Sequence, residues 1–173
     1  MDTLDSIRDA LPEVASDTRL NLQSVLENSS LDETQRWGVA VACGYASRNK
    51  ELAAALVKIA STKVDAGVID DAKMATSLMS MNNVYYRFRH IIEKPTYGTM
   101  PARLRMNKLR QPKGSGANLE LYCLAVSAIN NCQACVQSHE KVVLEKGLTE
   151  ENVNDAVRIA AVIQATAVSL ELA

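Results

Sequence analysis

Residues 118–139, NLELYCLAVSAINNCQACVQSH, contain the clearest indication of the fold. The apolar run in the first half predicts a helix over about 117–129, and the second half predicts another over about 132–146. Asn130 and Asn131 separate the two, which indicates a sharp turn that would pack one helix against the other. This stretch therefore predicts a helical hairpin.

Helical spacing of apolar residues continues through most of the remaining chain. Further helices are expected over about 3–10, 12–27, 31–49, 50–64, 70–93 and 149–172. Gly67 is expected to break one of them before Asp70 opens the next. No alternating run of four to eight residues competes as a strand. Only 4% of the residues are aromatic, which disfavours a sheet-rich protein. The 173 residues are therefore expected to form one compact all-α domain of about eight helices, spanning 1–173.

Residues 94–117 are the one long stretch without a helical pattern, and loops of this length are usually functional or wrap a partner. The overlapping segment 87–113 has eight basic residues against the single acid Glu93, although the whole chain has a net charge of −1. These basic residues either pair with acids, within the chain or across a subunit boundary, or they dock an acidic partner such as a protein reductant.

Several classes of protein are disfavoured. The net charge of −1 argues against a general nucleic-acid binder. The longest uncharged stretch, 121–138, is interrupted by four amide side chains, so it is a poor membrane span. No basic-then-apolar leader opens the chain, which predicts a cytoplasmic protein. In a reducing compartment, a close cysteine pair is more typical of redox or metal chemistry than of a structural disulfide.

A faint internal repeat is visible at a shift of 85 residues. This shift places Trp37 on Tyr122 and Ser47 on Cys132. If the repeat is real, the fold consists of two copies of one helical unit, and only the second copy has reactive groups. A shared order of helices in the two halves is the test.

The chemistry is predicted at Cys132, Cys135 and His139. With Asn131 as N-cap, Cys132 would be the first helical residue, where the helix dipole lowers the pKa of a thiol. At about 100° per residue the three side chains fall at roughly 0°, 300° and 340°, on one face of one helix. The two sulfurs are then close enough for a disulfide, and His139 is within reach of Cys135.

Glu120 is a lone carboxylate among apolar residues, so it needs a partner. Across the predicted hairpin it could face His139 or the thiols, and a carboxylate that orients a histidine is a usual way to activate a thiol. The same groups could instead bind zinc. Cys43 and Cys123 lie on apolar helical faces and are expected to be buried and inert.

Glu120, Cys132, Cys135 and His139 reproduce the Glu-X11-Cys-X2-Cys-X3-His signature of the alkyl hydroperoxidase D proteins, in the carboxymuconolactone decarboxylase-like superfamily. The chain resembles that family over nearly its whole length. Three further segments are similar: residues 81–87 (MNNVYYR), 104–107 (LRMN) and 125–130 (AVSAIN).

The resemblance implies an all-helical subunit in homotrimers or their multiples, with its catalytic half at about 117–173. It implies an antioxidant thiol peroxidase of the lipoyl-dependent type. No bound cofactor or metal is expected, since the thiol cycle needs none and the glycines form no phosphate loop. The partner would be the peroxiredoxin alkyl hydroperoxide reductase C. Electrons would come from dihydrolipoyl groups on a lipoylated acyltransferase, recharged by dihydrolipoamide dehydrogenase.

The resemblance also implies a role for each residue of the signature. Cys135 would be the peroxidatic cysteine that becomes a sulfenic acid, Cys132 the proton donor and resolving thiol, and Glu120 and His139 the proton relay. Some members of the family have a histidine where this chain has Ala134, so a relay here must work without it.

The helix dipole favours Cys132 as the more acidic thiol, so Cys132 is the expected site of exchange with incoming disulfides. Two alternatives belong to other classes. A decarboxylase of the wider superfamily would not need both cysteines, and a zinc-binding interaction module would not turn over peroxide.

Overall fold

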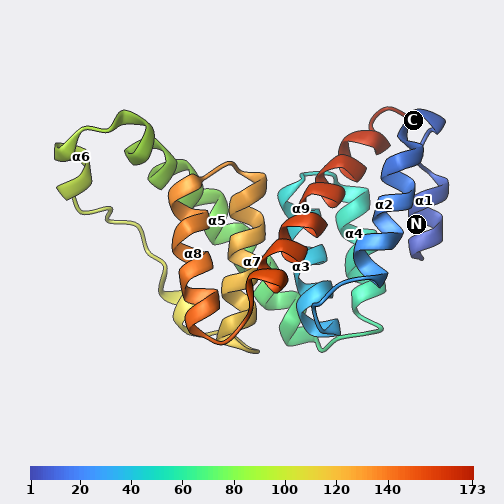
Figure 1. Cartoon of the computed structure of the whole chain (residues 1–173), viewed down its shortest axis with the longest axis horizontal. Coiled ribbons are helices and arrows are strands. Elements are labelled where there is room, and N and C mark those ends of the chain that lie inside the picture. Colours follow the sequence, from blue (N-terminus) through green and yellow to red (C-terminus); the bar gives the residue numbers. More distant parts are fainter.

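The computed structural model describes all residues from 1 to 173 and contains helices but no strands (Figure 1). The α-helices are α1 (Leu4–Asp9), α2 (Ser16–Glu27), α3 (Glu33–Ala46), α4 (Lys50–Ala60), α5 (Ala66–Ile92), α6 (Pro95–Thr99), α7 (Gly116–Ile129), α8 (Gln133–Glu145) and α9 (Glu150–Leu170). Two 3₁₀ turns, η1 (Glu13–Ala15) and η2 (Asn107–Arg110), complete the fold. The all-α prediction is confirmed.

Two boundaries differ from those predicted. Gly67 does not break a helix: α4 ends at Ala60, and Gly67 lies in the first turn of α5. Asp70 does not open a helix either, because α5 already begins at Ala66 with Asp65 as its N-cap. The neighbouring Asp71 instead joins α5 to the later connection, since its carboxylate accepts hydrogen bonds from the backbone N–H groups of Lys113 and Gly114. The segment 94–117, expected to be irregular, contains the short helix α6 and the turn η2.

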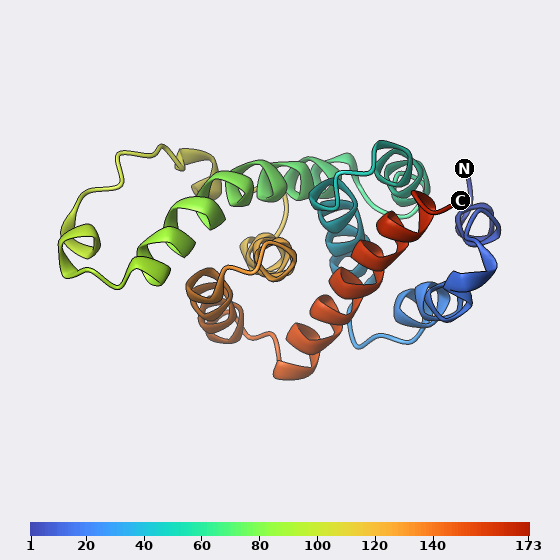
Figure 2. The same cartoon turned by 90° about the horizontal axis from the view of Figure 1, so that it is seen from above.

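Helices α3 and α7 pack together in the middle of the molecule, and α5 and α9 each contact both of them (Figure 2). The approach of α3 to α7 requires a glycine. A Cβ atom on Gly38 would lie 2.1 Å from Cζ of Tyr122, far inside van der Waals contact. The Tyr122 hydroxyl donates a hydrogen bond to the carbonyl of Thr34 at 3.1 Å, so the polar group of this buried side chain has a partner.

The two halves share one order of helices, as the repeat hypothesis required. Helices α3, α4 and α5 begin 83, 83 and 84 residues before α7, α8 and α9. The turns agree as well, because Arg48 and Asn131, 83 residues apart, both have left-handed backbones, with φ of 62° and 53°. The offset therefore aligns Asn49, rather than Ser47, with Cys132, which corrects the pairing predicted from sequence.

The end of α5 and the helix α6 form an arm that projects from the body (Figures 1 and 2). Large apolar side chains are exposed along it: Val84, Phe88, Ile91 and Met100. The chain then returns to the body through η2, and the exposed apolar arm is typical of a contact surface.

Helix α9 is long and apolar enough to cross a membrane, judged by length and composition alone. It packs against α2, α3 and α7, and Ile159, Ile163 and Ala167 lie in the hydrophobic core. A central core helix has this composition too, so α9 gives little reason to infer a membrane span.

Candidate active site

The turn between α7 and α8 places the two reactive cysteines. Asn130 caps the end of α7, and Asn131 follows with its left-handed backbone, a position that asparagine tolerates well. Cys132 is the residue that begins α8 as its N-cap, without a side-chain capping bond. The prediction that Asn131 is the N-cap was therefore wrong by one residue.

The equivalent turn in the first half shows what an ordinary N-cap does at this position. There Asn49 caps α4, and its Oδ1 accepts the backbone N–H of Leu52 at 2.9 Å. In the second half Cys132 replaces Asn49, and Cys135 stands at the position of Leu52. A Cys132 thiolate would therefore lie where the first-turn N–H groups and the helix dipole stabilise an anion.

Cys132 and Cys135 form a disulfide, with an S–S distance of 2.01 Å and Cα atoms 5.3 Å apart. The sequence prediction that the two sulfurs can join is confirmed in geometry. Their surroundings differ, because Cys132 is fully buried whereas Cys135 is 7% exposed. The exposed sulfur-bearing side chain of the pair is therefore Cys135, and the burial of Cys132 disfavours the expectation that Cys132 meets incoming disulfides.

Glu120, on α7, and His139, on α8, contact each other across the helical hairpin. The Nδ1 of His139 lies 2.7 Å from Oε2 of Glu120, and both side chains are largely buried. The carboxylate accepts the Nδ1–H, which leaves Nε2 as the ring nitrogen that can exchange a proton. Nε2 lies 3.2 Å from the thioether sulfur of Met79.

A cavity of about 420 Å³ opens beside Cys135 and His139. Helix α5 contributes Met79, Asn82 and Tyr86, the η2 region contributes Met106 and Leu109, and α8 contributes Ala134, Cys135, Ser138 and His139. Because Met106 and Leu109 belong to the segment 94–117, that long connection helps to build the site. Ala134 also lines this cavity, so this chain presents a methyl group there and no second imidazole.

A hydrogen-bond network on α5 holds the turn that bears Cys132. Asn83 is almost fully buried; its amide donates to Ser127 and accepts from the Asn130 side chain, both at 2.9 Å. Arg87 donates to the carbonyl of Asn130 at 2.6 Å. Sequence reasoning assigned no role to Asn82 or Asn83, and it expected Arg87 to pair with an acid or to dock a partner rather than to hold this turn. The available signal was a pair of amides, Asn82 and Asn83, within an apolar helical stripe.

Cys43 and Cys123 lie in the core, as predicted, and form no disulfide. Burial raises the pKa of both thiols far above the usual range. They are therefore protonated and unreactive in the native protein.

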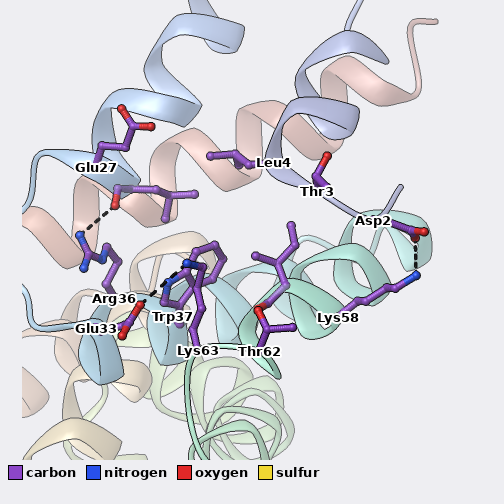
Figure 3. Close-up of a pocket in the computed structure, with 12 residues that line it drawn as sticks. Asp2, Thr3, Leu4, Glu27, Glu33, Arg36, Trp37, Lys58, Thr62 and Lys63 are labelled. Carbon is purple, nitrogen blue, oxygen red and sulfur yellow. Dashed lines mark hydrogen bonds and ion pairs between the residues drawn. The ribbon is translucent and has the colours of Figure 1, made fainter.

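A larger cavity, of about 570 Å³, lies between the N-terminal segment and helices α2, α3 and α4 (Figure 3). Trp37 forms part of its wall. Two of its carboxylates are already paired, Asp2 with Lys58 at 2.7 Å and Glu33 with Lys63 at 3.9 Å. This cavity contains neither a thiol nor an imidazole.

No group of three or more His, Cys, Asp or Glu side chains is arranged to hold a metal ion. The geometry thus gives the zinc-binding alternative no support, since a zinc site needs three or four converging ligands.

Comparison with known proteins gives two findings. The model of the carboxymuconolactone decarboxylase family matches residues 95–173. Proteins named alkyl hydroperoxide reductase AhpD are similar over the whole chain. The relative from Anaeromyxobacter sp. (strain K) is 56% identical over 100% of this chain and 93% of its own. Those from Brucella canis and Methylocella silvestris are 48% and 46% identical over 99% of this chain and 98% and 96% of theirs.

Proposed function

Because the chain belongs to the alkyl hydroperoxidase D (AhpD) family, within the carboxymuconolactone decarboxylase-like superfamily, we propose that it reduces organic hydroperoxides by a thiol–disulfide cycle of Cys132 and Cys135. Such a reaction makes it an antioxidant oxidoreductase. The observation that supports this most directly is a cysteine pair at bonding distance, with one sulfur facing a cavity that also contains the Glu120-bound His139.

The cycle begins with a proton transfer from the Cys135 thiol to Nε2 of His139. Glu120 stabilises the resulting imidazolium through Nδ1–H. The Cys135 thiolate attacks the terminal oxygen of the hydroperoxide, so that an S–O bond forms and the O–O bond breaks. Sulfur is oxidised to the sulfenic acid, and the departing alkoxide takes the proton from His139 and leaves as the alcohol.

Cys132 then resolves the sulfenic acid. Its sulfur attacks the sulfur of Cys135, an S–S bond forms, and the hydroxyl group leaves with the Cys132 proton as water. The burial of Cys132 supports this role, because a sulfur that substrate cannot reach is well suited to react only with its neighbour.

Reduction of the disulfide is proposed to begin at Cys135, the exposed sulfur. An external thiolate bonds to Cys135, and Cys132 departs as a thiolate at the start of α8, where the helix dipole makes it a good leaving group. The second thiol of a dithiol then releases Cys135 and becomes a disulfide itself. Dihydrolipoyl groups on a lipoylated acyltransferase, recharged by dihydrolipoamide dehydrogenase, are the proposed donors. The proposed partner is the cytoplasmic peroxiredoxin alkyl hydroperoxide reductase C, which this chain would keep reduced.

Counting free thiols tests the cycle. The reduced, denatured protein is expected to show four reactive thiols, and two after one equivalent of tert-butyl hydroperoxide has reacted with the native protein. Peptide mapping should place the two that remain at Cys43 and Cys123, which are buried. Four thiols after treatment, or loss of Cys43 or Cys123, would contradict the cycle.

The arm is proposed to join subunits into a homotrimer. Ile91 is 70% exposed and Val84 is 62% exposed, and apolar groups so placed gain stability from burial between copies. Sedimentation is expected to give a mass of three 18.8 kDa chains, or a multiple of that mass where trimers associate further. Ile91→Asp should dissociate the assembly, whereas Val14→Asp, also at an exposed apolar side chain but distant from the arm, should not. A monomeric wild-type protein would rule out the trimer.

A decarboxylase is the second candidate, because the family model that matches residues 95–173 has that name. Cys132→Ser distinguishes the two functions, since a decarboxylase of this superfamily would remain active without the redox pair.

A further inference from the structure

Asn82 is a buried polar residue in the wall of the cavity that contains Cys135 and His139. It is only 5% exposed. Its Nδ2 donates to the thioether sulfur of Met106 at 2.9 Å, but its Oδ1 is buried without a hydrogen-bond partner. Buried carbonyl oxygens are almost always paired, and leaving one unpaired destabilises the fold.

The next residue along α5 shows the contrast. Both ends of the Asn83 amide are paired, with Ser127 and with Asn130. The orientation of Asn82 is also determined, because a thioether can accept a hydrogen bond but cannot donate one. Nδ2 therefore faces Met106, and the carbonyl oxygen is left without a partner on a side chain that lines the cavity.

We propose that Oδ1 of Asn82 binds the substrate by accepting a hydrogen bond from the terminal O–H of the hydroperoxide, an inference that rests on the proposed function. The terminal oxygen is the one that the Cys135 thiolate attacks, and it is the only atom of an alkyl hydroperoxide that donates a hydrogen bond. Tyr86, Met106 and Leu109 line the same cavity and provide apolar contacts for the alkyl group.

The chemistry of the step gives this hydrogen bond a distinctive consequence. When the O–O bond breaks, the terminal oxygen moves to sulfur together with its hydrogen, so the same O–H belongs first to the hydroperoxide and then to the sulfenic acid. Asn82 can hold it throughout the oxidation. Reduction of the Cys132–Cys135 disulfide by a dithiol involves no such O–H, so Asn82 should not affect it.

The experiment compares three rates in Asn82→Leu, which removes the acceptor at nearly constant size, and in Asn82→Ala, which also avoids any overpacking. Oxidation of the reduced protein by tert-butyl hydroperoxide is expected to slow about tenfold or more, as loss of a buried hydrogen bond implies. Reduction of the disulfide by dithiothreitol, and alkylation of Cys135 by iodoacetamide, should stay within about twofold of wild type. Asn118→Leu is the matched control, because Asn118 is a buried asparagine outside this cavity.

Slower oxidation alone, in both variants, is the expected result. Oxidation at the wild-type rate, or equal slowing of all three reactions, would overturn the role of Asn82 while leaving the proposed function intact. A wild-type protein that tert-butyl hydroperoxide does not oxidise would contradict the proposed function, and the role of Asn82 with it.

Discussion

Replacing Cys135 with serine is expected to abolish hydroperoxide reduction, with a loss of about a thousandfold or more. Cys135 is the one sulfur of the pair that reaches the cavity, since Cys132 is fully buried. A serine hydroxyl at this position cannot ionise near neutral pH and cannot form a sulfenic acid. The measurement is consumption of tert-butyl hydroperoxide with dithiothreitol as the reductant.

Cys132→Ser separates the two halves of the cycle. This variant should still consume one equivalent of hydroperoxide, because Cys135 remains, but it cannot form the disulfide, so its sulfenic acid should be trapped by dimedone at Cys135. Cys43→Ala is the control for cysteine loss in general and should turn over normally, since the Cys43 thiol is buried and protonated. The two roles would be reversed if dimedone labelled Cys132 in the Cys135→Ser variant but did not label Cys135 in the Cys132→Ser variant.

Much of the helical pattern was predictable because the chain marks its helix ends locally. Thr149, where the last helix was expected to begin, caps α9 in a reciprocal capping box with Asn152. Gly147 has the positive φ of 90° expected of a glycine that follows a helix end. These signals depend on neighbours within four residues, which sequence displays directly.

The turn that bears the thiols was harder to assign, because asparagine suits two different positions. It is a good N-cap and also tolerates the left-handed backbone at the end of a helix. Asn131 takes the second position, and Cys132, which is fully buried, becomes the N-cap. The repeat contained the missing information, since the first half has Arg48 and then a true N-cap, Asn49, in the equivalent turn.

The contact between Glu120 and His139 was one of the two that the predicted helical hairpin allowed, the other being with the thiols, but the cavity beside them was not predicted. Its walls come from three places distant in sequence: Asn82 on α5, Met106 before η2, and Cys135 on α8. The helical periodicity and the composition of a sequence do not reveal which distant segments lie together in the fold. An unpaired amide oxygen likewise becomes visible only once its neighbours in space are known.

Glu120→Gln is expected to lower the rate of oxidation by hydroperoxide about a hundredfold, within the usual range for loss of a proton relay. The neutral amide keeps the shape of the carboxylate but cannot stabilise a charged imidazole 2.7 Å away. His139→Gln should have a similar effect. Because the two residues act as one unit, the double variant should be little slower than either single variant.

The Glu120 experiment needs a control carboxylate outside the relay and a readout that separates catalysis at Cys135 from substrate binding. Glu145→Gln, at an exposed carboxylate on α8, should leave the rate unchanged, because its only ion pair is with Lys141 at the surface, at 3.9 Å. The relay supplies and removes the proton of Cys135, so its loss should reduce kcat rather than raise KM. If the fold reductions in rate of the two single variants multiply in the double variant, Glu120 and His139 act independently. A Glu120→Gln protein as fast as wild type would exclude Glu120 from the relay.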